Sequence, residues 1–338
     1  MSDFFDKYGE SNQVKKQDDA GQKKSPDSDF FVNYPVSQPG EYRPDAKQES
    51  RAEQNTSVEP ETQQNMDSLF NELNSLIGLQ KVKAQVRELT QYVRVQEMRR
   101  QKGLGVTNLS LHSVFHGSPG TGKTIVARIY SKMLKAMGLL SKGHFVETDR
   151  AGLVGNYIGQ TANKTDEKIK EALGGVLFID EAYALYKGEH AQSDYGSEAI
   201  EVLMKRMEDN RNDFAVIVAG YPAPMVEFLN SNEGFKSRFV NTIDFEDYSP
   251  DELMQIFSLL CSQNNYSPKK DAIELVKIII ESSHANRDKR FGNARDIRNK
   301  FEKIIKNQAL RIGETMIHPT NDQLQVIEPE DVYPLLHS

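Results

Sequence analysis

The sequence predicts an α/β fold in which a parallel sheet carries a phosphate-binding loop and a smaller helical domain follows. Three observations predict it. A glycine-rich segment at residues 117–124 stands between an apolar run and a helical pattern, residues 176–179 are apolar and end in two carboxylates, and residues from about 250 onward read mostly as helices. Strand, loop and helix in this order are the setting that a phosphate-binding loop requires.

The glycine-rich segment follows the pattern G-x-x-x-x-G-K-T after a short apolar run at residues 111–115. It consists of Gly117, Ser118, Pro119, Gly120, Thr121, Gly122, Lys123 and Thr124. Its glycines allow backbone N–H groups to surround phosphate oxygens, and the start of the next helix adds a positive dipole end. We expect Lys123 to reach the β- and γ-phosphates of ATP and the Thr124 hydroxyl to bind Mg²⁺.

The helix after this loop is expected to turn one apolar side toward the core. The residues of that side are Ile125, Val126, Ile129, Tyr130 and Leu134.

The apolar segment 176–179 reads as a buried parallel strand. It delivers Asp180 and Glu181 to the carboxyl end of the sheet, where open α/β sheets bind ligands. We expect Asp180 to hold Mg²⁺ through its water shell and Glu181 to polarise the attacking water as a general base. An acidic first turn of a helix is the alternative, and it is weak because the phosphate loop needs an acidic strand end nearby.

Length and composition exclude several classes of protein. The chain has 338 residues, enough for two or three folding units, and a net charge of -7, which does not suit a general nucleic-acid binder. Its single cysteine, Cys261, excludes an intramolecular disulfide and favours a reducing compartment. No apolar run approaches the roughly 20 residues of a membrane span, and the first residues lack a signal-peptide pattern. These features predict a cytoplasmic protein.

Residues 1–65 differ from the rest of the chain. They contain no Leu and no Ile, and they carry a net charge of -5 of the chain's -7. A segment without branched aliphatic residues buries too little surface to offset its conformational entropy. We therefore predict a disordered acidic arm at residues 1–65 and a folded part at residues 66–338.

The arm repeats one pattern, S-D-F-F-x-x-Y, at residues 2–8 and 28–34. Aromatic side chains anchor disordered segments in a partner's pockets, and two copies raise avidity on a multivalent partner. The repeat favours a docking role for the arm over chance recurrence in a polar tail.

The phosphate loop and the LFIDEA strand end resemble those of AAA+ ATPases. Residues 177–186 (LFIDEAYALY), 219–225 (AGYPAPM) and 292–299 (GNARDIRN) resemble the CbxX/CfxQ family, which includes red-type Rubisco activases and stage V sporulation protein K-like ATPases. The resemblance covers residues 66–338. It implies a parallel five-stranded sheet of order 5-1-4-3-2 in an AAA+ domain at residues 66–248, a helical lid at 249–338, ATP hydrolysis and a hexameric ring.

The resemblance also assigns two arginines. Arg238 matches the arginine finger that completes the neighbouring subunit's site, with Lys236 as a nearby competitor. Arg295 matches the sensor 2 arginine of the lid. Arg298, one helical turn later, could share that role or pair with Asp296.

Two further segments are compared with the family pattern. The fourth strand, at residues 215–219, is followed by Gly-Tyr-Pro and lacks the usual Asn, so no sensor 1 residue is assigned. Backbone groups of Ile77 and Gly78 are expected to read the adenine edge. The next helix is expected to place Val82, Val86, Leu89 and Val93 in the core.

A loop after the second strand (residues 145–147) contains Tyr157, Ile158 and Gly159. The resemblance implies that this aromatic–apolar–glycine triplet faces a central pore and grips a polypeptide; an exposed turn tyrosine is the alternative. A second polar loop, at residues 187–196, could also line the pore. His190 and Asp194 in it make a poor metal site because no further ligand is near in sequence.

The lid is expected to begin at a capped helix at Ser249-Pro250 that runs to Cys261. A second helix is expected through residues 273–282, and a third carries Arg295 and the core positions Phe301, Ile304 and Ile305. Residues 324–332 resemble a short terminal strand and the start of a final helix.

The leading hypothesis is an ATP-driven ring that remodels or threads a protein substrate through its pore. Three alternatives stay open at this point: a red-type Rubisco activase that releases inhibitory sugar phosphates, a nucleic-acid motor, and a nucleotide-gated scaffold. The acidic balance of the chain and the aromatic pore loop argue against a nucleic-acid motor.

Overall fold

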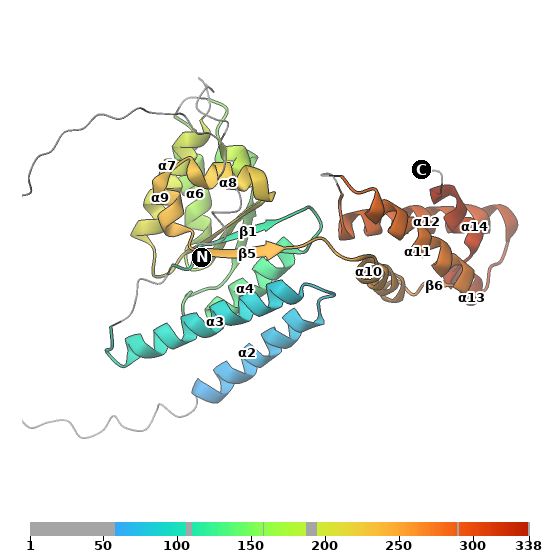
Figure 1. The fold of residues 1–338 in the computed structure, drawn as a ribbon, viewed down its shortest axis with the longest axis horizontal. Helices are drawn as coiled ribbons and strands as arrows, with labels where there is room; N and C mark the ends of the chain where they lie inside the picture. Colours follow the sequence, from blue (N-terminus) through green and yellow to red (C-terminus); the bar gives the residue numbers. More distant parts are fainter. Residues whose placement is uncertain (1–57, 106–109, 158, 187–194, 289–290, 337–338) are drawn as a thin grey trace, which may run out of the picture. The chain divides into compact units, whose positions relative to one another are not determined.

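The computed structural model describes residues 58–105, 110–157, 159–186, 195–288 and 291–336 (Figure 1). Both S-D-F-F-x-x-Y segments, Ile158, and the His190 and Asp194 pair lie outside the described residues. Within those ranges, no helix has both the length and the apolar character that a membrane span requires.

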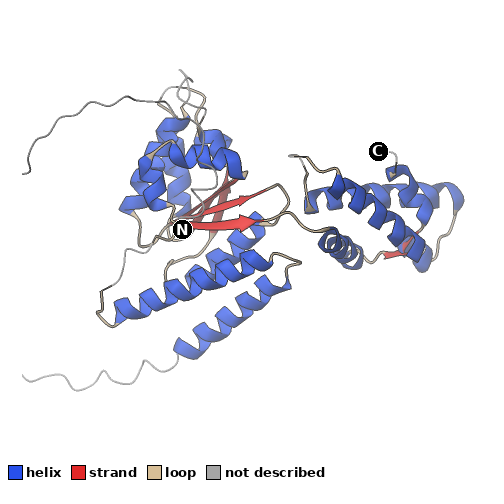
Figure 2. Cartoon of the chain, viewed as in Figure 1, coloured by secondary structure: helices blue, strands red, loops and turns tan. Residues whose placement is uncertain are grey.

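The central sheet is parallel and has five strands in the order β2-β3-β4-β1-β5 (Figure 2). This confirms the predicted order 5-1-4-3-2, which is the same order counted from the opposite edge strand. The strands are β1 (Ser113–Gly117), β2 (Phe145–Thr148), β3 (Val176–Ile179), β4 (Ala215–Gly220) and β5 (Asn241–Phe245). The order matters for function because β4 separates β1, which leads into the phosphate loop, from β3, which leads into the carboxylates.

Helices cover both faces of the sheet (Figure 1). Because successive side chains of a strand point to opposite faces, Phe115 packs in one buried cluster with Val126, and its neighbour Val114 packs in another with Leu203. The first face is covered by α2 (Val58–Ser75), α3 (Gln80–Gln101) and α4 (Lys123–Ala136), and the second by α6 (Thr161–Ala172), α7 (Gly196–Asp209), α8 (Pro222–Asn230) and α9 (Glu233–Arg238).

Helix α2 begins at Val58, so residues 58–65 are helical where the sequence predicted disorder. Proline and acidic residues are compatible with a first helical turn. The buried side chains of Met66, Leu69 and Leu73 stabilise the helix against the domain. The lack of Leu and Ile before residue 66 therefore did not mark the start of the helix.

The apolar sides of α3 and α4 are mostly as predicted. Val82, Val86 and Val93 are buried, while Leu89 is half-buried. On α4 the prediction was wrong for Ile125, whose side chain is 54% exposed. It lies beside the buried Val126 but on the neighbouring face of the helix, since adjacent residues of a helix are about 100° apart.

The lid follows β5 and is mainly helical. Its elements are α10 (Pro250–Gln263), β6 (Ser267–Pro268), α11 (Lys270–Ala285), α12 (Ala294–Thr315), α13 (Asn321–Gln325), β7 (Val326–Ile327), α14 (Pro329–Val332) and a 3₁₀ turn (Tyr333–Leu335). The predicted cap is confirmed, since Ser249 and Glu252 form a capping box at the start of α10. The predicted terminal strand is β7, which pairs with β6.

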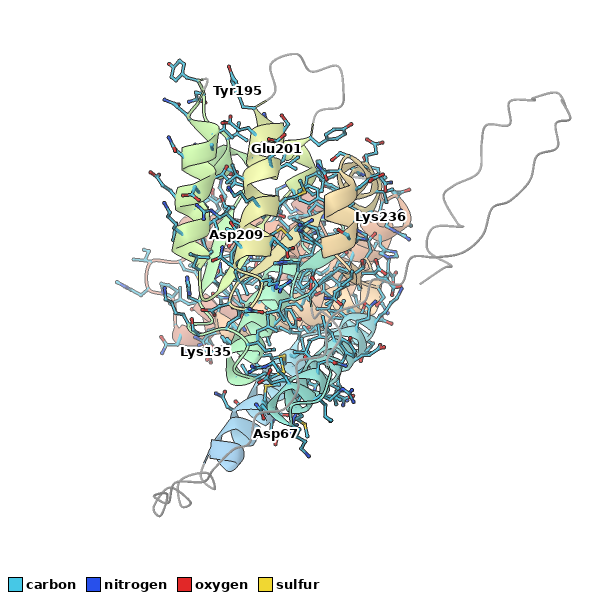
Figure 3. All side chains as sticks on the ribbon, turned by 90° about the vertical axis from the view of Figure 1, so that its left-hand side faces the viewer. Asp67, Lys135, Tyr195, Glu201, Asp209 and Lys236 are labelled. Carbon is cyan, nitrogen blue, oxygen red and sulfur yellow. The ribbon has the colours of Figure 1, made fainter. Side chains whose placement is uncertain are left out.

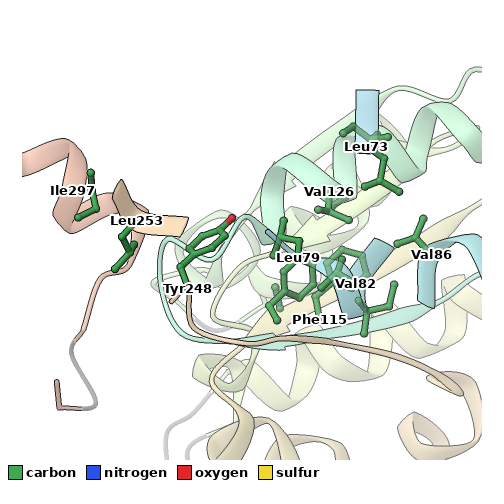
Figure 4. Packing of buried hydrophobic residues seen from close by; sticks show 14 of the residues in the cluster. Leu73, Leu79, Val82, Val86, Phe115, Val126, Tyr248, Leu253 and Ile297 are labelled. Atoms are coloured by element: carbon green, nitrogen blue, oxygen red, sulfur yellow. The ribbon is translucent and has the colours of Figure 1, made fainter. Parts of the chain in front are cut away.

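A single buried cluster runs from the sheet into the lid (Figure 4). Leu79 and Tyr248 pack in the same cluster as Leu253 of α10 and Ile297 of α12. The predicted lid core is confirmed for Phe301 and Ile304, which are buried. The buried cluster is therefore continuous between the α/β domain and the lid.

Cys261 lies in this cluster, on α10, and is 2% exposed. Burial raises the pKa of its thiol to about 11. The thiolate is the reactive form, so the folded chain should react with iodoacetamide about 100-fold or more slowly than the chain in urea. Mass spectrometry of the alkylated fraction over time measures this ratio, with Cys261→Ser as the blank. Equal rates in both states would contradict the buried placement.

Candidate active site

The phosphate loop connects β1 to α4. The Lys123 ammonium donates to the carbonyl oxygens of Gly117 and Ser118, both at 2.8 Å. The Thr121 hydroxyl also donates to Ser118 O at 2.8 Å. Gly122, which precedes α4, has a φ of 95°, a left-handed conformation that glycine adopts without a steric penalty. The loop is thus held by its own side chains in a curled form.

Lys123 is buried, with 8% of its surface exposed. Burial lowers its pKa, and the negative charges of Asp180 and Glu181 act in the opposite direction. The charged form of a buried ammonium is stabilised when a further negative charge is placed near it. The position therefore favours a polyphosphate over a neutral ligand.

The two carboxylates follow β3, which pairs with β4. Glu181 adopts a left-handed conformation (φ 50°, ψ 42°), and its N–H donates to Asp180 Oδ1 at 3.1 Å. For a residue other than glycine, such a conformation costs on the order of 1–3 kcal/mol and is concentrated at functional sites. Burial, and then the charge of Asp180, raises the pKa of Glu181. A carboxylate with a raised pKa is a stronger base.

The residues present fit a magnesium ion. Thr124 lies in the first turn of α4, and Asp180 directly follows β3, so a hydroxyl and a carboxylate lie at the same edge of the sheet. Mg²⁺ is usually held by one or two protein oxygens together with water and substrate phosphates. No group of three or more His, Cys, Asp or Glu able to hold a metal occurs among the described residues.

The lid brings Arg295 to the phosphate loop. A Cβ built on Gly120 would lie 2.8 Å from the backbone nitrogen of Arg295, at the start of α12. The Arg295 charge acts on the pKa values of both Lys123 and Glu181, lowering each. Asp296 accepts a hydrogen bond from the Gly292 N–H at 2.8 Å. The predicted Arg295 thus lies at the site.

The segment predicted to read adenine also lies at this place. Gly78 has a φ of 61°, and a Cβ on it would contact the Glu252 carboxylate and, at 3.2 Å, the Tyr248 ring. Leu79, next to it, approaches Gly122 of the phosphate loop. Ile77 and Gly78 therefore lie where the phosphate loop meets the start of the lid.

Arg238 lies at the opposite edge of the sheet. It ends α9 just before β5, and its carbonyl accepts a hydrogen bond from Ser110, which precedes β1. Its guanidinium contacts Glu208 at 3.3 Å. In a parallel sheet the amino ends of all strands share one edge and the carboxyl ends share the other. The chain's own phosphate loop and Arg238 are thus on different edges. Lys236, on the same helix, is exposed (Figure 3).

Tyr157 lies in the loop between α5 (Arg150–Leu153) and α6, and it is 70% exposed. Gly159 has a φ of 80°, and nothing lies within 4 Å of a Cβ built on it. The loop is thus open to solvent around its aromatic side chain.

Tyr221 is a site residue that the sequence analysis passed over. It directly follows β4, between the phosphate loop and the two carboxylates. Its ring contacts that of Tyr183 at 6.3 Å between centroids. Burial, and then the charge of Glu181, raises its pKa, while Arg295 lowers it. The signal was present in the sequence as a polar residue at the strand's end, but only Asn was sought there.

Known proteins share these features. The family model for the "ATPase family associated with various cellular activities (AAA)" matches residues 113–246, and the model for the "AAA lid domain" matches residues 249–337. Stage V sporulation protein K of Bacillus subtilis is 43% identical over 242 residues, which cover 71% of this chain and 74% of that protein. The chain belongs to the CbbX/CfxQ family of AAA+ ATPases. It is the same family as the CbxX/CfxQ family that the sequence motifs resemble; CbxX and CbbX are two spellings of one name.

Other relatives agree. The chloroplastic ribulose bisphosphate carboxylase/oxygenase activase of Cyanidioschyzon merolae is 41% identical over 275 residues, covering 80% of this chain and 90% of the relative. Protein CbbX of Cereibacter sphaeroides is 42% identical over 258 residues, covering 76% and 82%. As a member of this family, the chain is an ATP-hydrolysing enzyme, and AAA+ ATPases typically oligomerise.

Solved structures support the fold alone. The FIGL-1 AAA domain in complex with ADP matches with a TM-score of 0.55 at 16% identity, covering 78% of this chain and 82% of that one. A mutant of RuvB from Thermotoga maritima matches with a TM-score of 0.52 at 18% identity, covering 78% and 71%. Identities this low carry no information on what this chain acts on.

Proposed function

We propose that the protein is a cytoplasmic ring ATPase, a hexamer of identical subunits, that remodels or threads a protein substrate through its central pore. The observation that carries the substrate class is Tyr157. At 70% exposed, it is the most exposed aromatic side chain among the described residues. An aromatic ring can wedge against any side chain or backbone, so its grip is tolerant of sequence.

The site geometry supports the following roles in hydrolysis. Lys123 binds the β- and γ-phosphates, and Thr124 and Asp180 hold Mg²⁺, which neutralises charge on the phosphates. Glu181 accepts the proton of the attacking water. Arg295 reaches the nucleotide from the lid, and Ile77 and Gly78 contact the adenine. Arg238 of each subunit stabilises charge in the neighbour's site.

The Tyr157→Ala variant should retain its basal ATPase rate and lose the increase in rate that an unfolded protein produces. The reason is that Tyr157 lies on a loop outside the nucleotide site. Steady-state ATPase assays with and without casein, used as a permanently unfolded probe, measure this. Tyr157→Phe is the matched control and should behave as the wild type, since it keeps the ring. If Tyr157→Ala responds to casein and remodels substrate normally, the threading model is wrong.

The client is a separate question. Rubisco is one candidate, because a relative at 41% identity is named a Rubisco activase. The arm at residues 1–65, with its repeated S-D-F-F-x-x-Y segments, is a proposed docking element for a partner protein. A pull-down with the Glu181→Gln variant, in ATP, with and without residues 1–65, would identify the client and test the arm together.

A nucleic-acid motor is the rival function. Stimulation of ATP hydrolysis by single- or double-stranded DNA, with no response to casein, would replace the protein-remodelling model by this one. A nucleotide-gated scaffold would instead be supported if cells carrying Glu181→Gln showed a normal phenotype.

A further inference from the structure

Tyr248, just before the lid, and Asn293 and Ala294, at the start of α12, donate hydrogen bonds to three consecutive carbonyl groups of the phosphate loop. The three hydrogen bonds are Asn293 Nδ2 to Pro119 O at 3.4 Å, Ala294 N to Gly120 O at 3.3 Å, and Tyr248 Oη to Thr121 O at 3.4 Å. With the bonds that Lys123 donates to Gly117 and Ser118, they engage the loop's carbonyl groups from residue 117 to residue 121.

Asn293 is central to this arrangement. Its side chain is fully buried, and its backbone has a φ of 49° and a ψ of -125°, a conformation that few residues other than Gly adopt. Its Oδ1 accepts the N–H of Tyr248 at 2.9 Å, and its Nδ2 also donates to Asp247 Oδ1 at 2.8 Å. One amide thus joins the segment that links the two domains to the phosphate loop.

The backbones of loop and lid touch directly at Gly120. This residue has a φ of 70°, and a Cβ on it would collide with the carbonyl oxygen of Gly292. No side chain therefore separates the phosphate loop from the residues before α12. A shift of the lid at this point acts on the loop's peptide groups themselves.

Peptide geometry makes these bonds relevant to the nucleotide. In a trans peptide the carbonyl of one residue and the N–H of the next point in opposite directions. Fixing the carbonyl groups of residues 119, 120 and 121 therefore fixes the N–H groups of Gly120, Thr121 and Gly122. Backbone N–H groups of such loops are what bind phosphate oxygens.

We propose that Asn293, Ala294 and Tyr248 form a clasp that sets the orientation of the phosphate-binding N–H groups, with Asn293 as a positioning residue for nucleotide affinity. The clasp makes affinity for a nucleoside di- or triphosphate depend on the seating of the lid through the loop's main chain, in addition to any contact of Arg295. The inference rests on the ATP site of the family and is independent of the threading model.

A charge swap separates positioning from a purely structural role. Asn293→Asp places two carboxylates together and removes the donor to Pro119, so both thermal stability and affinity for a fluorescent ADP analogue should fall, the latter about tenfold or more. Adding Asp247→Asn restores a hydrogen bond between the two side chains, because the new amide can donate to the new carboxylate. It does not restore a donor to Pro119. The double variant should therefore regain the melting temperature of Asp247→Asn alone while its affinity stays low.

Recovery of both properties in the double variant would show that Asn293 only stabilises the joint, and it would overturn the proposal. Should the double variant fail to fold, Tyr248→Phe decides, because it keeps the packed ring and removes one hydroxyl. It should weaken ADP binding about 3- to 10-fold with a near-unchanged melting temperature, and an unchanged affinity would overturn the clasp. The Lys123→Ala variant gives the background fluorescence of the ADP analogue when it is not specifically bound. If the wild type gave no more than this background, the proposed nucleotide site would be wrong, and the result would not count against the clasp.

Discussion

The Arg238→Ala variant should bind ATP with near-normal affinity and hydrolyse it about a thousandfold or more slowly than the wild type. A guanidinium beside the γ-phosphate stabilises the charge that develops in the transition state. Steady-state phosphate release gives the rate, and equilibrium titration with a fluorescent ATP analogue gives the affinity.

This expectation follows from where Arg238 lies. Its carbonyl is bonded to Ser110 at the amino edge of the sheet, while Lys123 and Glu181 follow the carboxyl ends of their strands or loop. A ring with head-to-tail interfaces brings different surfaces of neighbouring subunits together. Such an interface can place one subunit's amino edge against the next subunit's nucleotide.

Mixing two inactive variants tests this arrangement. Subunits with Arg238→Ala bind nucleotide but offer no finger, and subunits with Lys123→Ala offer the finger but bind no nucleotide. In a randomly mixed ring, roughly a quarter of the sites combine a working loop with a neighbour's arginine, so the mixture should be far more active than either variant alone. Activity no higher than that of the separate variants would indicate that Arg238 does not act between subunits.

Lys236→Ala is the matched control, because Lys236 lies on the same short helix and is exposed. It should hydrolyse ATP at a rate close to that of the wild type. A large loss in this variant, with normal activity in Arg238→Ala, would transfer the role to the lysine.

The sequence predicted those parts of the site that a short stretch of the chain specifies by itself. Each of the two main motifs directly follows its own strand, so a short segment specifies both the residue and its position. The order of the strands, by contrast, depends on contacts between distant segments and was obtained from family resemblance. Arg238 illustrates the difference. Its position in the sequence alone predicts no more than a surface arginine, and only the folded sheet shows that it lies at the edge opposite to Lys123.

Other features depend on tertiary packing, which the periodicity of apolar residues in the sequence does not reveal. Ile125 is apolar and fits a helical pattern, yet it is 54% exposed because the α4 face it occupies is not covered. The start of α2 at Val58 was missed because the prediction used the lack of Leu and Ile, and a helix requires neither residue in its first turns. Asn293 reads in sequence as part of a lid motif, and its contact with Pro119 becomes visible only when both domains are in place.

The Glu181→Gln variant should bind ATP and form rings while turning over about 10²- to 10⁴-fold more slowly than the wild type. The amide has the size of the carboxylate and suits the same backbone conformation, so the change removes the proton acceptor and little else. Single-turnover hydrolysis, together with sedimentation in ATP, measures the rate and the assembly. The control is Asp180→Asn, which should instead raise the Mg²⁺ concentration needed for tight ATP binding, because Asp180 is the proposed metal ligand.

The pH dependence provides a separate check on the same residue. Burial and the charge of Asp180 raise the pKa of Glu181, and only the deprotonated carboxylate can accept a proton from water. Wild-type kcat should therefore fall with decreasing pH through a value above that of an ordinary glutamate. In the Glu181→Gln variant, the residual rate should not show this decrease at low pH. If the decrease persists unchanged in that variant, another group causes it, and Glu181 is not the general base.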